Sequence, residues 1–159
     1  MKILLVYPKN PETYWSFKHA LKFVSKKAVN PPLGLITVAT LLPDHWEKKL
    51  IDMNVSPLNG NDIKQADYVF ISAMSVQIKS VNEIIQRCKS EGKKIVAGGP
   101  LFTEEFDKFP DVDHLVLNEA EITLPLFLRD LMNGSAKHIY KSLDFADIQF
   151  SPLPDYSLI

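Results

Sequence analysis

Small hydroxyl side chains, amides and glycines follow three successive apolar stretches of this sequence. Ser72-Ala73-Met74-Ser75 ends one stretch, Ala97-Gly98-Gly99-Pro100 ends the next, and Asn118-Glu119-Ala120-Glu121 ends the third. Polar groups of these kinds can hydrogen-bond a ligand, and a glycine lets a ligand approach the backbone closely. If the stretches are parallel strands, their carboxyl ends meet at one edge of a sheet, and we expect one continuous pocket there.

The elements that must position these residues alternate between apolar strands and segments of helical spacing. Strands are predicted over residues 2–7, 46–53, 68–73, 94–97 and 114–117, and residues 138–141 can add an edge strand. Helices are predicted over 33–42, 59–66, 77–91 and 123–132, with Asn30 and Thr123 as caps and Gly92 and Gly134 as terminators. The fold class is therefore α/β, a flavodoxin-like or Rossmann-like doubly wound parallel sheet of about five strands in the order 2-1-3-4-5.

Two segments depart from this alternation. The connection over residues 9–30 is far longer than the roughly 2–6 residues usual between a strand and a helix, and its apolar residues predict an inserted amphipathic helix. That helix packs on its own domain, or it forms a lid or a docking face. Residues 143–159 contain Pro152 and Pro154 and no regular period, so we expect a linker or strap that lies on a surface after a domain over residues 1–142.

Composition excludes several function classes. The chain of 159 residues has 18 Lys and Arg against 19 Asp and Glu, so no strong field attracts nucleic acid. No apolar run approaches the roughly 20 residues of a membrane span, and the expected location is cytoplasmic. The single cysteine, Cys88, lies on an apolar helical stripe and is expected to be buried. One cysteine cannot form an internal disulfide or hold an iron-sulfur cluster.

Other common occupants of this fold lack their motifs here. Tyr7-Pro8-Lys9-Asn10-Pro11 follows the first strand where a dinucleotide-binding domain has Gly-x-Gly-x-x-Gly, and the phosphate-loop motif is absent. The four histidines, His19, His45, His114 and His138, show no metal-binding spacing. Catalysis by this chain alone is therefore not expected. A flavin-binding or nucleotide-binding module remains as an interpretation supported by fold alone.

The segments that remain resemble a known family in their order along the chain. They are Lys2–Pro8, Pro31–Leu35, Ile71–Ser75, Val96–Pro100 and Asp113–Glu121. Together they resemble the vitamin B12-binding (cobalamin-binding) domain, in the version found at the N-terminus of class B radical S-adenosylmethionine (SAM) enzymes. Residues 152–155, Pro-Leu-Pro-Asp, resemble the strap that precedes the radical domain in that family.

The resemblance implies cobalamin as the cofactor. Its corrin ring would lie over the carboxyl ends of the strands, and its nucleotide tail would enter a pocket edged by Ser72 and by Gly98 and Gly99. The cofactor-binding residues it implies are Tyr7, Pro8, Pro32, Leu33, Gly34, Ser72, Met74, Ser75, Gly98, Gly99, Pro100, Asn118, Glu119 and Glu121. No catalytic residue and no metal ligand is implied in this chain.

The resemblance also implies a partner. In the family, a C-terminal radical SAM domain holds a 4Fe-4S cluster and SAM and acts on a small-molecule substrate by methyl transfer or by cyclase-type radical chemistry. Some members are labelled magnesium-protoporphyrin IX monomethyl ester cyclases. That domain is absent from these residues.

The chain departs from the family pattern in two places. Many cobalamin domains carry Asp-x-His-x-x-Gly after the first strand, and its histidine is a cobalt ligand; His19 is the only histidine in that loop and its context differs. Cobalamin is therefore expected to bind without a histidine lower ligand. The usual Gly-Glu-Gly-Glu turn is Asn118-Glu119-Ala120-Glu121 here. These departures leave open an alternative, a docking or scaffold domain that has lost the ligand.

Overall fold

A six-stranded parallel sheet forms the centre of the molecule, in the computed structural model that describes residues 1–12 and 30–159. The strands, in sequence order, are β1 (Lys2–Tyr7), β2 (Glu47–Asp52), β3 (Tyr68–Ser72), β4 (Lys94–Gly98), β5 (His114–Leu117) and β6 (Ile139–Lys141). They lie in the order β2-β1-β3-β4-β5-β6, and each pair is parallel. This confirms the predicted α/β class and the 2-1-3-4-5 order, and the optional edge strand is the sixth.

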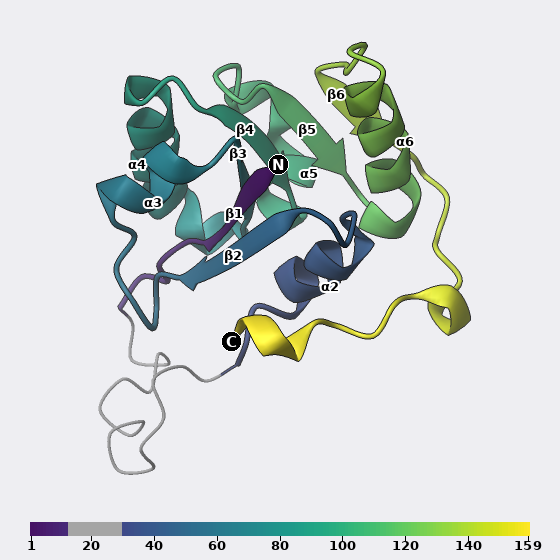
Figure 1. Cartoon of the computed structure of the whole chain (residues 1–159), viewed down its shortest axis with the longest axis horizontal. Coiled ribbons are helices and arrows are strands. Elements are labelled where there is room, and N and C mark those ends of the chain that lie inside the picture. The colour runs from purple at the N-terminus through teal and green to yellow at the C-terminus, as the bar shows by residue number, and fades with distance from the viewer. Residues whose placement is uncertain (13–29) are drawn as a thin grey trace.

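Helices connect the strands and cover both faces of the sheet (Figure 1). The helices are α2 (Leu33–Leu41), α3 (Gly60–Gln65), α4 (Ile78–Ser90), α5 (Pro100–Glu105) and α6 (Ala120–Met132). Single 3-10 turns span Ser75–Gln77, Phe106–Lys108, Ile148–Phe150 and Tyr156–Leu158. None of the helices in the described ranges is both long and apolar enough to cross a membrane.

Alternation along the strands divides the core into two layers. In β1, Leu4 and Val6 face the layer that includes Ile63 of α3 and Ile84 of α4. The neighbouring Ile3 and Leu5 face the layer under α2 and α6. Because successive strand residues point to opposite faces, a continuous apolar run is what a strand covered on both faces requires.

Two sequence expectations about helix starts are wrong. Pro32, and not Asn30, precedes the first residue of α2, and no side chain caps that end. Thr123 does not begin α6; it is fully buried in the helix, and its hydroxyl donates to the Glu119 carbonyl at 2.9 Å. If Thr123 were the cap, Pro125 would lie in the first turn of the helix. Proline has no backbone N–H, and a first turn does not need one. The structure places Pro125 inside the helix instead.

Helix α5 was not predicted. Pro100 is its first residue, and the Leu101 N–H donates to the Ala73 carbonyl at 3.0 Å. The helix is only six residues long, so its sequence carries less than two turns of periodic signal. The formation of α5 therefore depends on tertiary contacts with the end of β3. The predicted inserted helix lies within residues 13–29, outside the described residues.

The C-terminal segment runs around α6 and across α2 (Figure 1, yellow). The Thr40 hydroxyl donates to the Leu153 carbonyl at 3.1 Å, the Asp155 N–H donates to the Ile36 carbonyl at 3.3 Å, and Leu158 packs against the core. The segment also exposes large apolar side chains: Leu143, Phe145, Ile148, Leu153, Tyr156 and Ile159. It therefore lies on the domain surface while presenting apolar groups outward.

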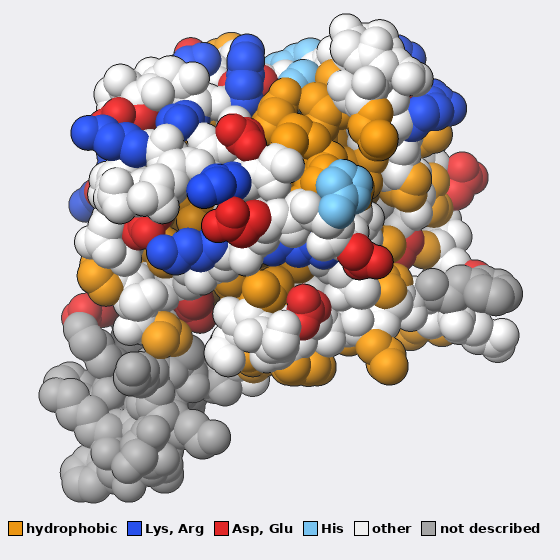
Figure 2. Space-filling model, in the orientation of Figure 1, with side chains coloured by type: hydrophobic (Ala, Val, Ile, Leu, Met, Phe, Trp, Pro, Cys, Tyr) orange, Lys and Arg blue, Asp and Glu red, His pale blue; other side chains and the backbone are white. Residues whose placement is uncertain are grey.

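Charged side chains of both signs are mixed on the surface of the described residues. Figure 2 shows lysine, arginine and acidic side chains interspersed over much of the visible face, with hydrophobic side chains gathered beside α6. Ion pairs such as Lys49 with Asp62 and Lys94 with Asp113, each at 2.7 Å, reflect this mixing.

Candidate functional site

The carboxyl ends of β3, β4 and β5 form one pocket between α2 and α6. Ser72 and Gly98 are register partners on neighbouring strands, and Gly98 pairs with Val116 on the next. These residues, with Gly99 and Asn118, line a pocket that contains about 400 Å³ of empty space, its open mouth included. The prediction that polar strand ends come together is therefore correct for Ser72, Gly98, Gly99 and Asn118.

The walls of the pocket are apolar. Leu35 and Val38 of α2, Phe70 of β3, and Ala120 and Leu124 of α6 line it. Small-molecule pockets typically combine such walls with a few polar groups that fix orientation. The sequence prediction did not include these residues in the site. Apolar residues at helical spacing indicate burial, but they do not distinguish the core from the wall of a pocket.

The two glycines of the pocket are required by the protein itself. A Cβ on Gly98 would lie 2.5 Å from the Val116 carbonyl oxygen of the adjacent strand. Gly99 has a φ of +88°, and a Cβ there would lie 2.8 Å from the Ser72 hydroxyl oxygen. Close approach between neighbouring strand ends therefore accounts for both glycines, whereas the sequence interpretation was that they make room for a ligand.

Asn118 takes the conformation that a glycine would have. Its φ is +65°, which makes it the non-glycine residue with positive φ among the described residues. Asparagine tolerates this region better than most residues because its short side chain can hydrogen-bond locally. Its N–H donates to the Thr103 hydroxyl at 3.1 Å, and its side-chain amide donates to the Ser142 carbonyl. Asn118 therefore holds a left-handed turn in which glycine is the more usual residue.

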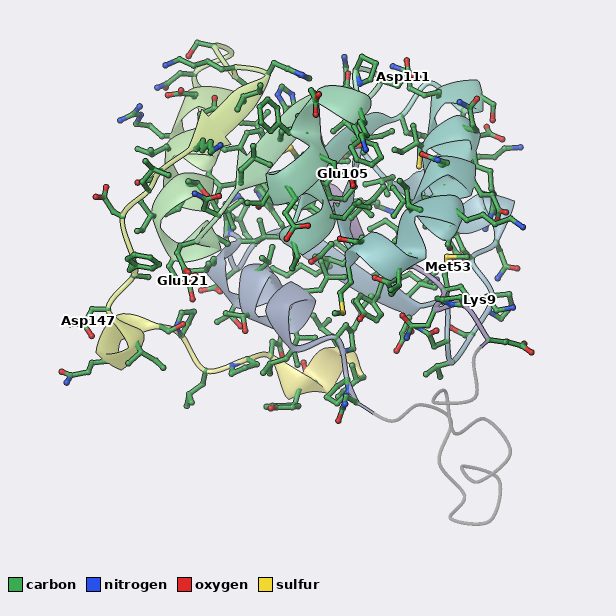
Figure 3. The ribbon with its side chains drawn as sticks, turned by 180° about the vertical axis from the view of Figure 1, so that it is seen from behind. Lys9, Met53, Glu105, Asp111, Glu121 and Asp147 are labelled. Atoms are coloured by element: carbon green, nitrogen blue, oxygen red, sulfur yellow. The ribbon has the colours of Figure 1, made fainter. Side chains whose placement is uncertain are left out.

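The other predicted site residues do not line the pocket. Each ends a strand, follows one, or lies at the start of the next helix. These residues are Tyr7, Pro8, Pro32, Leu33, Gly34, Met74, Ser75, Pro100, Glu119 and Glu121. Glu121 accepts a hydrogen bond from the Ser151 hydroxyl, and Figure 3 shows it at the start of α6 beside the C-terminal segment. Its carboxylate is thus engaged with that segment.

The loop after β1 is held by polar side chains that no sequence pattern singles out. Gln77, Asn54 and Ser80 hydrogen-bond its backbone. A single polar residue next to a strand end has no periodic signature. Tyr7, at the end of β1, has a pKa raised mainly by burial; a hydrogen bond with Gln77 opposes the rise and the Asp52 carboxylate adds to it. Its phenol is therefore neutral at physiological pH.

The described histidines lie away from this edge. His114 is the first residue of β5, His138 precedes β6, and His45 precedes β2, so all three are at the amino end of the sheet. In the described residues, His, Cys, Asp and Glu side chains form no group of three or more suited to a metal. His19 lies outside the described residues.

Cys88 is buried on α4, as predicted, and burial raises the pKa of its thiol to about 11. The thiolate, which is the nucleophile and the metal ligand, is therefore scarce at neutral pH.

Comparison with known proteins agrees with this geometry. Over its full length the chain is 41% identical to an uncharacterized methyltransferase of Synechocystis sp., of which it covers 30%. It is 27% identical over 99% of its length to hopanoid C-2 methylase of Rhodopseudomonas palustris, covering 31%. It is 26% identical over 98% of its length to bacteriochlorophyllide d C-12(1)-methyltransferase of Chlorobaculum tepidum, covering 33%.

The chain therefore spans about a third of the length of the curated relatives it matches. The family described as the B12 binding domain matches residues 24–128, which include α2, β3, β4, β5 and most of the pocket wall. With the strand order and the pocket at the carboxyl edge, this match shows that the chain belongs to the B12-binding domain family.

Proposed function

We propose that this chain is the cobalamin-binding module of a longer radical SAM enzyme, and that the pocket between α2 and α6 takes the nucleotide tail of the cofactor. The single observation that supports this most is the pocket itself. It opens at the carboxyl ends of β3, β4 and β5, has apolar walls, and carries the Ser72 hydroxyl at its edge. A flat aromatic base with a polar linker suits walls and an edge of this kind.

Exposed apolar residues that follow β1 and β3 suit a corrin ring over this edge of the sheet. Leu33 at the start of α2 is 52% exposed, and Met74 and Val76 after β3 are 51% and 61% exposed. Apolar side chains so exposed gain free energy when a ligand covers them. The ring edge carries amide groups, and Ser75 and nearby main-chain groups can hydrogen-bond them. When bound, cobalamin supplies a cobalt centre that can accept and release a methyl group.

The module binds cobalamin without a histidine lower ligand, in this proposal. The three described histidines are at the opposite edge of the sheet, which supports it. The iron-sulfur cluster and SAM belong to a further domain, because such a cluster needs three cysteines and this chain has one. The methyltransferase names of the relatives favour methyl transfer to a small molecule as the reaction of the whole enzyme.

We further propose that residues 1–142 form the module and that residues 143–159 are the strap leading to the radical domain. The support is that the segment is hydrogen-bonded to α2 while exposing Phe145, Ile148 and Leu153. These exposed apolar side chains would be covered by a second domain.

A visible-light titration of the purified chain with hydroxocobalamin tests the cofactor. Saturable binding with a spectrum free of histidine ligation is the expected result. A folded protein that takes up no hydroxocobalamin at high micromolar concentration contradicts the proposal.

Gly34→Ala tests whether the backbone at the start of α2 touches the ring. A Cβ on Gly34 would meet no atom within 4 Å, and the residue is in a helix, so alanine should stabilise the domain by roughly 0.5–1 kcal/mol. If the ring lies against this turn, the same methyl group weakens hydroxocobalamin binding about tenfold. Thermal unfolding and titration of one preparation measure both effects.

Gly60→Ala is the matched control for this variant. Gly60 is the first residue of α3 and a Cβ there also meets nothing within 4 Å. It should leave the affinity unchanged. An unchanged affinity in Gly34→Ala as well would place the ring away from the start of α2.

A further inference from the structure

A single buried side chain joins the loops after β1 and β3. Gln77, 1% exposed, donates from Nε2 to the Pro8 carbonyl at 2.7 Å. Its Oε1 accepts from the Met74 N–H at 2.8 Å. One amide thus bonds to both loops through a donor and an acceptor, and so fixes the distance between two segments far apart in the sequence.

Two more side chains, Asn54 and Ser80, hydrogen-bond the loop after β1. Neither of these bonds reaches the loop after β3. Asn54 donates to the Pro8 carbonyl at 3.2 Å and accepts from the Asn10 N–H at 2.8 Å. Ser80 accepts from the Lys9 N–H at 3.0 Å. Figure 3 shows Lys9 and Met53 close together at this edge, as the hydrogen bond from the Met53 N–H to the Tyr7 carbonyl requires. The loop after β1 is thus held to the end of β2 and to α4. Gln77 links this anchored loop to the loop after β3.

Both loops present groups to the edge where the ring would lie. Tyr7 ends β1 and is half-buried, while Met74 and Val76 follow β3 and are more than half exposed. We infer that Gln77 is a positioning residue, which holds the Tyr7–Pro8 loop and the Met74–Val76 loop in the relative placement that cobalamin binding needs. This inference rests on the proposed function.

The chemistry of the side chain supplies a specific test. A neutral amide donates to one loop and accepts from the other, and a protonated carboxylic acid of the same shape does both as well. An ionised carboxylate cannot donate a hydrogen bond, and its negative oxygen would repel the Pro8 carbonyl oxygen. In Gln77→Glu, burial and the negative charges nearby raise the pKa of the new acid. Of the titratable groups on the neighbouring elements, Tyr7 on β1 hydrogen-bonds Gln77, Asp52 on β2 acts on Tyr7, and Glu104 on α5 accepts a hydrogen bond from Ser75, two residues before Gln77.

Hydroxocobalamin affinity of the purified chain, measured at about pH 5 and about pH 8, is the first readout. Relative to wild type at the same pH, Gln77→Glu should bind within about twofold at the lower pH and about tenfold or more weakly at the higher. Gln77→Met, which removes both hydrogen bonds without adding charge, should be weak at both. Gln86→Glu adds the same charge at an exposed position of α4 and should match wild type.

Hydrogen exchange of the Met74 amide, without cofactor, is the second readout. In Gln77→Met, which has no oxygen to accept the Met74 N–H, this amide should exchange faster than in wild type at both pH values, whereas Gln77→Glu keeps an acceptor oxygen and should protect it as in wild type. Circular dichroism at both values checks that the variants are folded.

The outcomes separate the two proposals. A folded wild-type chain that takes up no hydroxocobalamin overturns the proposed function, and this inference with it. Wild-type binding together with Gln77→Glu binding equally well at both pH values overturns the inference alone. Faster exchange at Met74 with unchanged affinity also overturns it, because the loop placement would then be irrelevant to the ligand.

Discussion

Ala120→Phe is expected to weaken hydroxocobalamin binding by at least about a hundredfold while leaving the domain folded. Ala120 is the first residue of α6, and its side chain lines the pocket between α2 and α6. A phenyl ring there occupies the space proposed for the nucleotide tail. Because even one added methylene changes binding about tenfold or more in a filled pocket, a whole ring should exclude the tail. Equilibrium dialysis against hydroxocobalamin measures the loss.

Ala136→Phe is the matched control. Ala136 is also a partly buried alanine packed against the same core layer, but it follows the other end of α6 and does not line the pocket. The affinity of Ala136→Phe for hydroxocobalamin should equal that of wild type. Dicyanocobinamide, which has the corrin ring but no nucleotide base, should bind Ala120→Phe and wild type alike. Equal loss of both ligands would place the ring, and not the tail, at this pocket.

Gly98→Ala is expected to destabilise the domain strongly in the absence of any ligand. The added Cβ would lie 2.5 Å from the Val116 carbonyl oxygen, which is backbone of the adjacent strand and cannot rotate away. Overpacking of this kind costs roughly 1–3 kcal/mol, and each kcal/mol lowers the Tm by roughly 2–4 °C in a domain of this size. Thermal unfolding of the cofactor-free chain measures the shift.

The comparison with Gly34→Ala makes this prediction specific. Both variants add one methyl group at the same edge of the sheet, but only the Gly98 methyl meets a backbone atom. The Tm should therefore fall in one variant and rise in the other. A Gly98→Ala chain as stable as wild type would show that β4 and β5 can separate at this point. Lost cobalamin binding in Gly98→Ala is by itself no sign of ligand contact.

The strands were predictable because their signal is local and repeated, and their order followed from the fold class that the alternation of strands and helices indicated. The run over residues 2–7 is apolar at nearly every position, which is what a strand covered on both faces shows. Gly92 and Gly134 end helices with φ of +63° and +68°, as their positions after periodic segments indicated. The caps at Asn30 and Thr123 were wrong, because several polar residues near a helix start can each fit the same local rule.

The candidate site was predictable only as a set of strand ends. Parallel strands bring Ser72, Gly98 and Asn118 to one edge whatever their neighbours are. The family resemblance came from the same segments, and the match over residues 24–128 agrees with it. The apolar pocket wall, which includes Val38 and Leu124, could not be predicted from the sequence. Core positions and pocket positions on a helix have the same periodicity.

The sequence by itself therefore determined the α/β class, the strand order, the absence of a cluster-binding cysteine set and the edge at which a ligand would sit. The class, the cysteine count and the edge follow from residue types or short repeats along the chain, and the strand order is the usual one of a flavodoxin-like fold. Only the tertiary structure decided that Gly98 is required by the Val116 carbonyl, that Asn118 can replace a glycine at φ +65°, and that Gln77 joins two loops. Those facts depend on distances between residues remote in sequence, and no local pattern encodes such distances.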